Sequence, residues 1–389
     1  MNIAIIGSGI GGLATANALL KKGFNVQVYE RAQVLRSIGA GLTLTPNGLN
    51  SLNAIQPGIV ESLISAGSPL ETLILKRSTG ETIASKPIAT VQHYGQPMLN
   101  IQWSKLQAIL ASALPSEIIH LQHRCVGVEQ QDNQVKAHFE SGKTVQADLL
   151  IGADGINSVV RQGAIGDCHA AYAGRMSWRA VIQYAHEQLA PHVATLLTAF
   201  DNKNMLLFDL GEGYTFWSAS ALLTHDALSR RHIDAKERVL ELFAGWAEPV
   251  EAIIAATPEA DIIERPIRDR LPIDHWSKGR VTLMGDAAHP VVPSLGQGAN
   301  MAFEDAYELA ECLSNAPDIE TALHVYETSR IPRTEVIYDR SANLGRNSYQ
   351  SDSETTFTKM MNPSQMNQDN FEAWLYSYNP SRLVIPNLC

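Results

Sequence analysis

Two patterns of hydrophobic and polar residues run along this chain, and they predict two kinds of sheet. A continuous apolar run at residues 3–6 leads into a glycine-rich turn, a helical pattern over residues 13–22 and a second strand over residues 26–30. Strands that are apolar on both faces are typical of parallel sheets covered by helices. The order of strand, helix and strand therefore predicts a βαβ unit at the start of the chain.

Two later segments carry the same buried-strand pattern. Residues 147–151 precede Gly-Ala-Asp-Gly at 152–155, and residues 280–284 precede Gly-Asp at 285–286. We expect both segments to join the first strands, so that one parallel sheet is assembled from distant parts of the sequence. After Gly296 the apolar residues recur at helical spacing, which predicts a helix there.

The segments between these strands have the alternating pattern of a different sheet. They cover residues 71–97 and roughly 172–268. Within the second piece, strands at 205–210 and 214–220 are separated by Gly-Glu-Gly at 211–213. Short glycine-rich turns of this kind join antiparallel strands. We therefore predict an antiparallel sheet that is inserted in two pieces.

Composition narrows the class of protein. With 389 residues, 45% of them hydrophobic and 18% charged, the chain is expected to fold into roughly two to four domains. A net charge of −10 without any concentration of Lys and Arg argues against nucleic acid as a partner. No apolar run is long enough for a transmembrane helix. The four cysteines stand far apart and form no Cys-x-x-Cys motif, so a cytoplasmic location is predicted.

The turn at residues 7–12 fits the G-x-G-x-x-G dinucleotide fingerprint at the required junction of strand and helix. Gly7 permits the sharp turn, Gly9 lets a pyrophosphate approach the backbone, and Gly12 lets helix and strand pack closely. The helix N-terminus adds N–H groups and a partial positive charge. Glu30, at the end of the second strand, can accept hydrogen bonds from an adenosine ribose. The alternative is a plain turn with a surface acid, which the complete context disfavours.

With two later motifs added, the chain resembles the class A flavoprotein monooxygenases, the family of p-hydroxybenzoate and salicylate hydroxylases. The later motifs are Gly-Ala-Asp-Gly at 152–155, followed by Asn-Ser-Val-Val-Arg at 157–161, and Gly-Asp-Ala-Ala-His-Pro at 285–290, which leads into Gly-Gln-Gly-Ala-Asn at 296–300. The resemblance extends over nearly the whole chain, to about residue 344. It implies FAD as the cofactor and NADH or NADPH as a transient reductant.

The resemblance also implies roles for the later motifs. Asp154 and Gly155 would support both FAD and the pyridine nucleotide, and Gly285 and Asp286 would hold the ribityl chain of FAD. Asp286 follows the carboxyl end of a parallel strand, where doubly wound sheets bind ligands. Asp154 also fits a simpler role as a turn or cap residue. His289, before a proline, is interpreted as a structural histidine.

The helix after Gly298 would direct its N-terminal N–H groups at the flavin and stabilise the negative charge of the reduced ring. The predicted cofactor-binding residues are Gly7, Gly9, Gly11, Gly12, Glu30, Arg31, Thr43, Trp103, Val126, Asp154, Gly155, Gly285, Asp286, Pro293, Gly296, Gly298, Ala299 and Asn300.

One position departs from the family. Relatives usually carry an arginine that contacts FAD three residues before the first leucine of the helix that begins near Ser104, and this chain has Trp103 there. An indole cannot neutralise a pyrophosphate. Either Arg31, Arg36 or Lys105 compensates, or FAD binds more weakly than is usual. We predict a measurable tendency to lose the cofactor.

The implied reaction is hydroxylation of an aromatic or conjugated small molecule. NADH or NADPH would reduce FAD, oxygen would add to give a flavin C4a-hydroperoxide, and its distal oxygen would pass to the substrate. The chemistry belongs to the flavin, so no catalytic side chain is assigned; Tyr172 and Tyr214 are interpreted as structural. The alternatives are an isoprenoid epoxidase of the same family and a flavin-binding sensor without turnover.

Substrate contacts are expected from the antiparallel sheet and from the loop before Gly296. The candidates are Trp178, Arg179, Asn204, Leu206, Phe208, Phe216, Pro293 and Ser294. Alternation puts Leu206 and Phe208 on one face of their strand and Met205 and Leu207 on the other, but does not say which face looks inward. Such a stripe also fits plain core. Urate-hydroxylating relatives have arginine and tyrosine near the positions of Asn204 and Phe216, which argues against a small anionic purine.

Other classes of protein explain less of the chain. A nicotinamide dehydrogenase would leave the Gly-Asp motif at 285–286 without a role, and no Gly-x-Ser-x-Gly elbow of a hydrolase is present. His120 and His123 stand close together but have no further ligands nearby in the sequence, so no metal site is predicted.

The predicted fold is α/β in three parts. A Rossmann-like FAD-binding domain of the GR2 type covers residues 1–70, 98–171 and 269–344. An inserted antiparallel-sheet domain covers residues 71–97 and 172–268, and a helical tail covers residues 345–389, with Phe371, Trp374, Leu375 and Tyr378 at helical spacing. The tail is expected to pack against the rest of the chain. The protein is expected to act as a monomer or homodimer.

Overall fold

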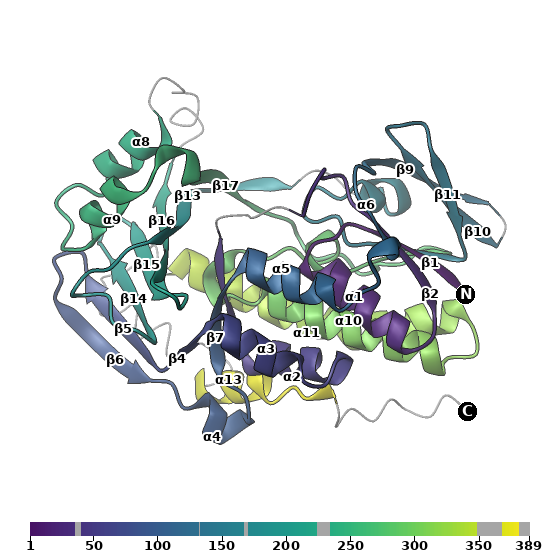
Figure 1. Cartoon of the computed structure of the whole chain (residues 1–389), viewed down its shortest axis with the longest axis horizontal. Coiled ribbons are helices and arrows are strands. Elements are labelled where there is room, and N and C mark those ends of the chain that lie inside the picture. The colour runs from purple at the N-terminus through teal and green to yellow at the C-terminus, as the bar shows by residue number, and fades with distance from the viewer. Residues whose placement is uncertain (36–39, 132, 167–169, 224–233, 348–367, 381–389) are drawn as a thin grey trace.

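The fold is seen in a computed structural model of the whole chain, which describes all residues except 36–39, 132, 167–169, 224–233, 348–367 and 381–389 (Figure 1). Its centre is a five-stranded sheet in the order β18-β12-β1-β2-β8, with every neighbouring pair parallel. The strands are β18 Val281–Leu283, β12 Leu149–Gly152, β1 Asn2–Ile6, β2 Asn25–Tyr29 and β8 Ile119–His120. The three distant buried strands thus lie together as predicted.

Helix α1 packs closely against the neighbouring helices α10 and α5. A Cβ at Gly11 of α1 would lie 3.2 Å from both the Ala302 Cβ of α10 and the Met284 Cε, which lets the two helices approach closely. The amide of Asn17 also joins α1 to α5 by a hydrogen bond to the Leu110 carbonyl, 3.0 Å away. These helices are α1 Ile10–Lys21, α2 Pro46–Ile55, α3 Ile59–Ala66, α5 Trp103–Ser112 and α10 Gly298–Asn315.

Two small sheets flank the central one. One has the order β11-β10-β9 and lies at the right of Figure 1 with α6 beside it; the other has the order β3-β7-β4 and leads toward the large antiparallel sheet. Their strands and short helices are β11 Thr144–Ala147, β10 Gln134–Phe139, β9 Cys125–Gln131, β3 Gly41–Leu44, β7 Met98–Gln102, β4 Ser68–Leu70, α6 Val159–Ala164 and the 3₁₀ turn Ser116–Ile118.

A seven-stranded sheet forms the left part of the molecule in Figure 1, in the order β17-β13-β16-β15-β14-β5-β6. All its pairs are antiparallel except β14 with β5. It draws strands from both predicted insertions, as expected. The strands are β17 Ile263–Asp269, β13 Ala171–Gln183, β16 Tyr214–Leu222, β15 Asn204–Asp209, β14 Val193–Thr198, β5 Thr72–Arg77 and β6 Thr82–Pro87.

The two faces of this sheet are covered differently. Met205 and Leu207 of β15 pack with Trp217 in a core that includes residues of α8 Ala235–Leu242 and α9 Val250–Ala256, so this is the outer face. On the opposite face, Phe208 packs with Phe216, with ring centroids 4.7 Å apart. Both rings contact Gly41 of β3, where a Cβ would lie only 2.8 Å from the Phe216 side chain. The inner face therefore looks toward the parallel-sheet part.

The C-terminal part packs against the rest of the chain, as predicted for the tail. Helix α11 Ile319–Asn347 runs beside α10, and α13 Gln368–Tyr376 follows. Phe371 and Leu375 of α13 are buried against Met301 and Ile337. In Figure 1, α13 lies between α2 and α4 Thr90–Tyr94. The remaining elements are the 3₁₀ turns Glu259–Asp261, Gly285–Ala287 and Pro293–Leu295.

Within the part of the chain that is described, no helix is both long and apolar enough to cross a membrane.

Candidate cofactor and active site

The glycine-rich turn between β1 and α1 has the tight backbone that its sequence predicts. Gly7 has φ +109°, and a Cβ there would lie 2.4 Å from the Ala153 carbonyl oxygen. A Cβ at Gly12 would lie 2.1 Å from the Gly7 carbonyl oxygen. Nothing lies within 4 Å of a Cβ built at Gly9. Side chains are therefore excluded at the first and last glycine, while the middle glycine borders open space.

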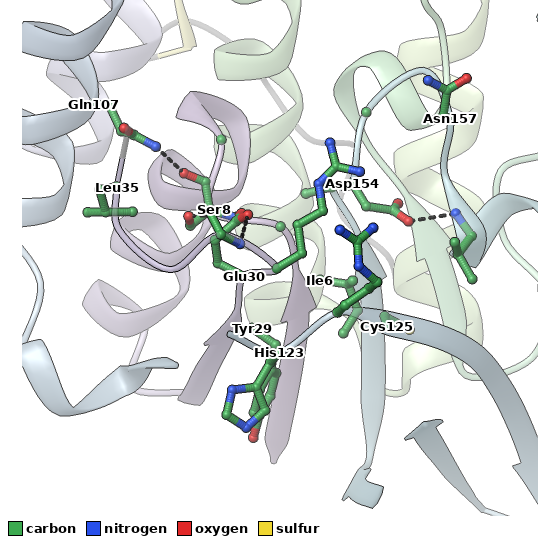
Figure 2. A pocket seen from close by; sticks show the side chains of 18 of the residues that line it. Ile6, Ser8, Tyr29, Glu30, Leu35, Gln107, His123, Cys125, Asp154 and Asn157 are labelled. Atoms are coloured by element: carbon green, nitrogen blue, oxygen red, sulfur yellow. Dashed lines mark hydrogen bonds between the residues drawn. The ribbon is translucent and has the colours of Figure 1, made fainter. Parts of the chain in front are cut away.

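That open space belongs to a cavity of about 540 Å³ at the carboxyl ends of β1, β2 and β12 (Figure 2). Its volume lies within the range of small-molecule and cofactor sites. The lining brings together predicted residues from distant parts of the sequence: Gly7, Gly9, Glu30, Arg31, Trp103, Asp154 and Gly155. Residues that were not predicted line it too, among them Ser8, Tyr29, Gln107, His123, Arg124 and Asn157.

Glu30 holds the shape of this turn. Its carboxylate accepts hydrogen bonds from the Ser8 amide at 2.9 Å, from the Ser8 hydroxyl at 3.1 Å and from the Ala32 amide at 2.8 Å. The Gln107 amide donates to the Ser8 carbonyl at 2.9 Å from the other side, as Figure 2 shows. Glu30 therefore orients the loop while it lines the cavity where a ribose would lie.

Positive charge near Trp103 comes from Arg31, which was one of the expected residues, and from Arg124, which was not. Arg31 lines the cavity, whereas Lys105 pairs with Glu212 at 2.7 Å and donates to the Ala66 carbonyl. Arg36 lies outside the described residues. Arg124 lines the cavity as well and makes a loose, exposed contact of 3.5 Å with Glu140. Arg124 is difficult to predict from the sequence as a site residue, because it is a single cation in a loop.

Asp154 acts as a cap in addition to lining the cavity. Its carboxylate accepts from the Val159 amide at 2.7 Å, from the Val160 amide at 3.3 Å and from the Ser158 hydroxyl at 2.5 Å. Burial raises the pKa of its carboxyl, and these hydrogen bonds oppose the rise. Within the protein, Asp154 therefore acts as a helix-capping residue, which is the simpler of the two roles that its sequence fits. Val126, on β9, is 53% exposed and is not among the residues that line the cavity.

Arg161 was not predicted, yet it connects two motifs. Its side chain is buried, and its Nη1 donates to the carbonyls of Ala287 at 3.2 Å and Ala288 at 2.9 Å. It thereby ties α6, which follows the Asp154 turn, to the turn that contains Asp286. The Asn-Ser-Val-Val-Arg sequence at 157–161 supports the resemblance, but the sequence does not show which groups the Arg161 side chain contacts.

The Gly-Asp turn is held from behind by Asp305 of α10. The Asp305 carboxylate accepts from the Gly285 amide at 2.9 Å and contacts the His289 Nε2 at 2.6 Å. His289 is buried against Trp276, as expected for a structural residue. The Asp286 side chain reaches solvent, but protein surrounds it on most sides. The resulting loss of solvation raises the pKa of its carboxyl, and the charge of His289 opposes this rise.

Behind Asp305 lies a buried group of charges. Arg330 donates to Glu304 at 2.6 Å and to Asp305 at 2.8 Å, and Arg333 donates to Glu304 at 2.7 Å. Burial alone would raise the pKa of Asp305, but the charges of His289 and Arg330 outweigh it and lower the pKa to about 2. Arg333 also donates to the Leu375 carbonyl at 3.0 Å, so this group anchors α13.

The N-terminus of α10 meets the Gly-Asp turn and β3. The Asp286 Oδ1 lies 3.7 Å from a Cβ built at Gly298. The Asn300 side chain accepts from the Thr45 amide at 3.0 Å and donates to the Thr43 carbonyl at 3.3 Å. Gly296 has φ +63° and ends the 3₁₀ turn that holds Pro293 and Ser294, while Ala299 packs against the core. The predicted residues from 285 to 300 and Thr43 therefore lie together.

The substrate candidates divide between the two faces of the large sheet. Leu206, Phe208 and Phe216 pack on the inner face, and the strand register places Asn204 and Arg179 on that face as well. Trp178 is the exception, because it packs on the outer face and donates to Glu264 at 2.7 Å. The structure therefore separates Trp178 from the other candidates, since odd and even positions of β13 point to opposite faces.

These features define a dinucleotide-binding α/β protein that carries an aromatic cluster on the inner face of its large antiparallel sheet. The family described as "FAD binding domain" matches residues 1–341. The 6-hydroxynicotinate 3-monooxygenase of Pseudomonas fluorescens is 35% identical over 85% of this chain and 88% of its own length. The 3-amino-4-hydroxybenzoate 2-monooxygenase of Streptomyces cremeus is 32% identical over 97% of this chain and 95% of its own.

A solved structure has the same fold over nearly its whole length. HpxO of Klebsiella pneumoniae, complexed with FAD and uric acid, superposes with a TM-score of 0.87 at 25% identity and covers 98% of this chain and 97% of its own. The chain belongs to the FAD-binding-domain family. It is an oxidoreductase, a flavoprotein monooxygenase with FAD as cofactor and NAD(P)H as reductant.

Proposed function

We propose that this enzyme hydroxylates an aromatic or conjugated small molecule held against the inner face of the large sheet. The observation that carries the proposal is the contact of Phe208 and Phe216 with Gly41 of β3. Through Thr43 and Asn300, β3 is joined to the N-terminus of α10 beside Asp286. An apolar aromatic wall would therefore border the flavin end of the proposed FAD site. Relatives named for hydroxylated aromatic substrates support the same class of reaction.

The chain would hold FAD along a path between two sites. At one end, the open space at Gly9 admits a pyrophosphate, and the N-terminus of α1 offers N–H groups to it. At the other end, Asp286 can accept hydrogen bonds from ribityl hydroxyls. The N-terminal amides of α10 would then be available to stabilise negative charge on the flavin. When bound, FAD supplies the electron transfer from NAD(P)H and the activation of oxygen.

The protein's own contribution is to orient the substrate and keep water away. The rings of Phe208 and Phe216 are buried and make an apolar wall. Such a wall excludes water from a reactive site. Asn204 and Phe216 stand where urate-hydroxylating relatives have arginine and tyrosine, so we propose a substrate other than a purine. Asn204 accepts from the Ser220 hydroxyl at 3.0 Å, which gives its side-chain oxygen an internal partner.

We also propose the domain division that the sequence predicts. The strands of residues 71–97 and 172–268 would form the substrate part, and the other described segments up to residue 344 would form the FAD part. No second G-x-G-x-x-G turn occurs in the sequence. We therefore propose a shared, transient site for NAD(P)H near the flavin.

The test is a turnover assay on the purified yellow protein. NAD(P)H oxidation is measured in air with a panel of phenols, hydroxypyridines and quinolones, and products are analysed by mass spectrometry. The proposal expects faster flavin reduction with at least one compound and a product that gains one oxygen as an aromatic hydroxyl. Gain of oxygen with loss of an alkene would instead establish an epoxidase. If NAD(P)H does not reduce the bound flavin in the presence of any compound of the panel, this result would establish a sensor.

We further propose a cytoplasmic location and a monomeric or homodimeric state. The two cysteines among the described residues, Cys125 and Cys312, are free and buried, which suits a reducing compartment. Light scattering on the purified protein determines the oligomeric state, and a trimer or larger assembly would contradict the proposal.

A further inference from the structure

We propose that Arg333 and Tyr378 are positioning residues for the flavin site, and that docking of the C-terminal helix α13 and binding of FAD stabilise each other. The proposal concerns the cofactor, so it is independent of which substrate the enzyme oxidises. It rests on a buried network of polar side chains. This network begins at the C-terminal segment and ends at the Gly-Asp turn of residues 285–286 and at the N-terminus of α10.

The network begins where the C-terminal segment packs against α11. Arg333 of α11 donates to the Leu375 carbonyl at 3.0 Å. Its guanidinium carbon lies 4.5 Å from the centroid of the Trp374 ring and 4.6 Å from that of the Tyr378 ring. The Tyr378 hydroxyl donates to Glu308 of α10 at 2.5 Å. Cations over aromatic rings and hydrogen bonds to charged groups are both favourable. Undocking of the C-terminal segment would break all these contacts together.

Two neighbouring carboxylates of α10 carry the network inward. Glu304 and Asp305 are fully buried, and Arg330 donates to them at 2.6 and 2.8 Å. Arg333 donates to Glu304 as well, from Nε at 2.7 Å and from Nη2 at 2.9 Å. Burial opposes ionisation of Glu304, but the charges of Arg333 and Arg330 outweigh it and lower its pKa. A buried charge that loses its partner is strongly destabilised. The carboxylates and the arginines therefore keep each other in place.

One branch of the network reaches the N-terminus of α10. The Asn47 amide donates to Glu304 at 2.7 Å and to the Gln297 side chain at 3.1 Å. The Gln297 amide donates to the Thr45 hydroxyl at 3.2 Å. All these side chains are buried. Gln297 immediately precedes Gly298, where α10 begins, so this branch fixes the helix end that is proposed to face the flavin.

A second branch reaches the Gly-Asp turn. Asp305 accepts a hydrogen bond from the Gly285 amide at 2.9 Å. Arg330, which holds Asp305, also lies 3.7 Å from Glu308, the partner of Tyr378. In the interior of a protein, the members of such a network strengthen and restrain one another. The C-terminal segment is thus connected through buried contacts with both parts of the chain that are proposed to hold the flavin.

This arrangement couples two equilibria. Bound FAD favours the state in which the Gly-Asp turn and the N-terminus of α10 are in place. In that state α10 presents its buried carboxylates to Arg333 and Tyr378. FAD should therefore raise the fraction of molecules in which α13 is docked. Docking must then raise the affinity for FAD by the same factor, because coupling between two binding events is reciprocal.

The first test compares the unaltered protein with and without FAD. Hydrogen exchange of the α13 amides is measured in the apoprotein and in the protein saturated with FAD. We expect FAD to slow their exchange about tenfold. Helix α8 is the reference, because it packs on the outer face of the large sheet. Unchanged exchange in α13, or an equal change in α8 and α13, would overturn the proposal, since the latter indicates general stabilisation.

The second test measures the dissociation constant of FAD by fluorescence titration of variant apoproteins. Arg333→Met should raise this constant about tenfold. Arg333→Lys should raise it less, because a positive charge remains beside Glu304. Tyr378→Phe removes only the hydrogen bond to Glu308 and should raise the constant severalfold. In Arg333→Met, FAD should also slow exchange in α13 no more than in α8.

Arg238→Met is the matched control. Arg238 of α8 also pairs with a carboxylate, that of Glu264 at 2.9 Å, but it lies on the outer side of the large sheet. Its affinity for FAD should equal that of the unaltered protein. The proposal is overturned if Arg333→Met and Tyr378→Phe both bind FAD normally, or if Arg238→Met loses affinity to the same extent as Arg333→Met. If Arg333→Met does not fold, Tyr378→Phe and the exchange measurement decide.

Discussion

Single residues decide how firmly this chain holds its cofactor, and Asp286 illustrates the point. Its carboxylate is accessible, lies beside Gly298, and is not engaged by the backbone in the way that Asp154 is. The Asp154 carboxylate accepts hydrogen bonds from backbone amides at the start of α6. Two aspartates that look alike in the sequence therefore have different surroundings, because one caps a helix and the other leaves its carboxylate accessible to a ligand.

We predict that Asp286→Ala abolishes flavin retention. The variant loses the acceptor for the ribityl hydroxyls, and a lost hydrogen-bonding group of this kind costs about 1–3 kcal/mol in binding. The ratio of flavin absorbance to protein absorbance after gel filtration measures it. Asp154→Asn serves as the comparison; unchanged flavin occupancy in Asp286→Ala would show that the Gly-Asp assignment is incorrect.

Trp103 leads to an opposite prediction. It lines the cavity together with Arg31 and Arg124, and Lys105 is occupied by Glu212. Trp103→Arg should tighten FAD binding about tenfold or more, because a charge-assisted hydrogen bond to the pyrophosphate is added. Fluorescence titration of the apoprotein measures the dissociation constant. The unaltered protein should lose flavin on dilution and in high salt, and full retention there would contradict the prediction.

Asp305 gives a prediction for pH. Its folded-state pKa of about 2 lies below the value of 3.8 expected when unfolded. The carboxylate therefore adds about 2 kcal/mol of stability above pH 4, and that contribution is lost as the pH falls from about 4 to 2. Urea unfolding of the unaltered protein and of Asp305→Asn at several acid pH values checks this. Parallel stability curves for the two proteins would count against it.

At the scale of elements, α13 shows how a short segment is stabilised by packing. A helix of its length is marginal by itself in water. It is held because Phe371 and Leu375 are buried and because Arg333 lies 4.5 Å from the Trp374 ring centroid. The helical spacing of the apolar residues predicted the helix, whereas its place beside α2 and α4 depends on residues more than 270 positions away, such as Lys86, the partner of Glu372.

We predict that Phe371→Ala weakens the docking of α13 by about 3 kcal/mol, since a buried aromatic side chain is removed and a cavity remains. Hydrogen exchange of the α13 amides measures the docking equilibrium directly. Phe200→Ala is the matched control, because Phe200 is 69% exposed and its loss should change stability by less than about 0.5 kcal/mol. Equal protection of α13 in both variants would exclude the proposed role of Phe371.

At the scale of the whole molecule, the proposed cofactor path joins parts that are distant in sequence. The cavity at Gly9, the turn at Asp286 and strand β3 are drawn from three separate segments. A ligand that touches all of them should stabilise the native arrangement as a unit. Removal of FAD is therefore expected to lower the stability of the entire fold and not only of one site.

We predict that saturating FAD raises the thermal midpoint of the apoprotein by several degrees. At a free concentration of about 100 times the dissociation constant, binding contributes about 2.7 kcal/mol. Differential scanning fluorimetry with increasing FAD checks this. At the same FAD concentration the shift should be larger for Trp103→Arg and smaller for Asp286→Ala, and an equal shift in all three proteins would indicate binding elsewhere.

The sequence by itself determined the parallel sheet, the glycine turn and the order of the motifs, because these depend on local rules. Gly7 and Gly12 are required where a Cβ would meet backbone at 2.4 and 2.1 Å, and apolar runs predict buried strands wherever they occur. The C-terminal helix and the two-piece insertion followed from periodicity in the same way.

Only the tertiary structure decided which face of β15 looks inward, that Trp178 faces away, and that Arg161 and Arg124 join the site. Alternation along a strand is symmetric, so it separates two faces without telling which one will be covered by α8 and α9. Contacts such as Asp305 with Gly285, or the absence of a partner for the Arg179 Nε among the described residues, arise from packing between distant segments, and no local pattern records them.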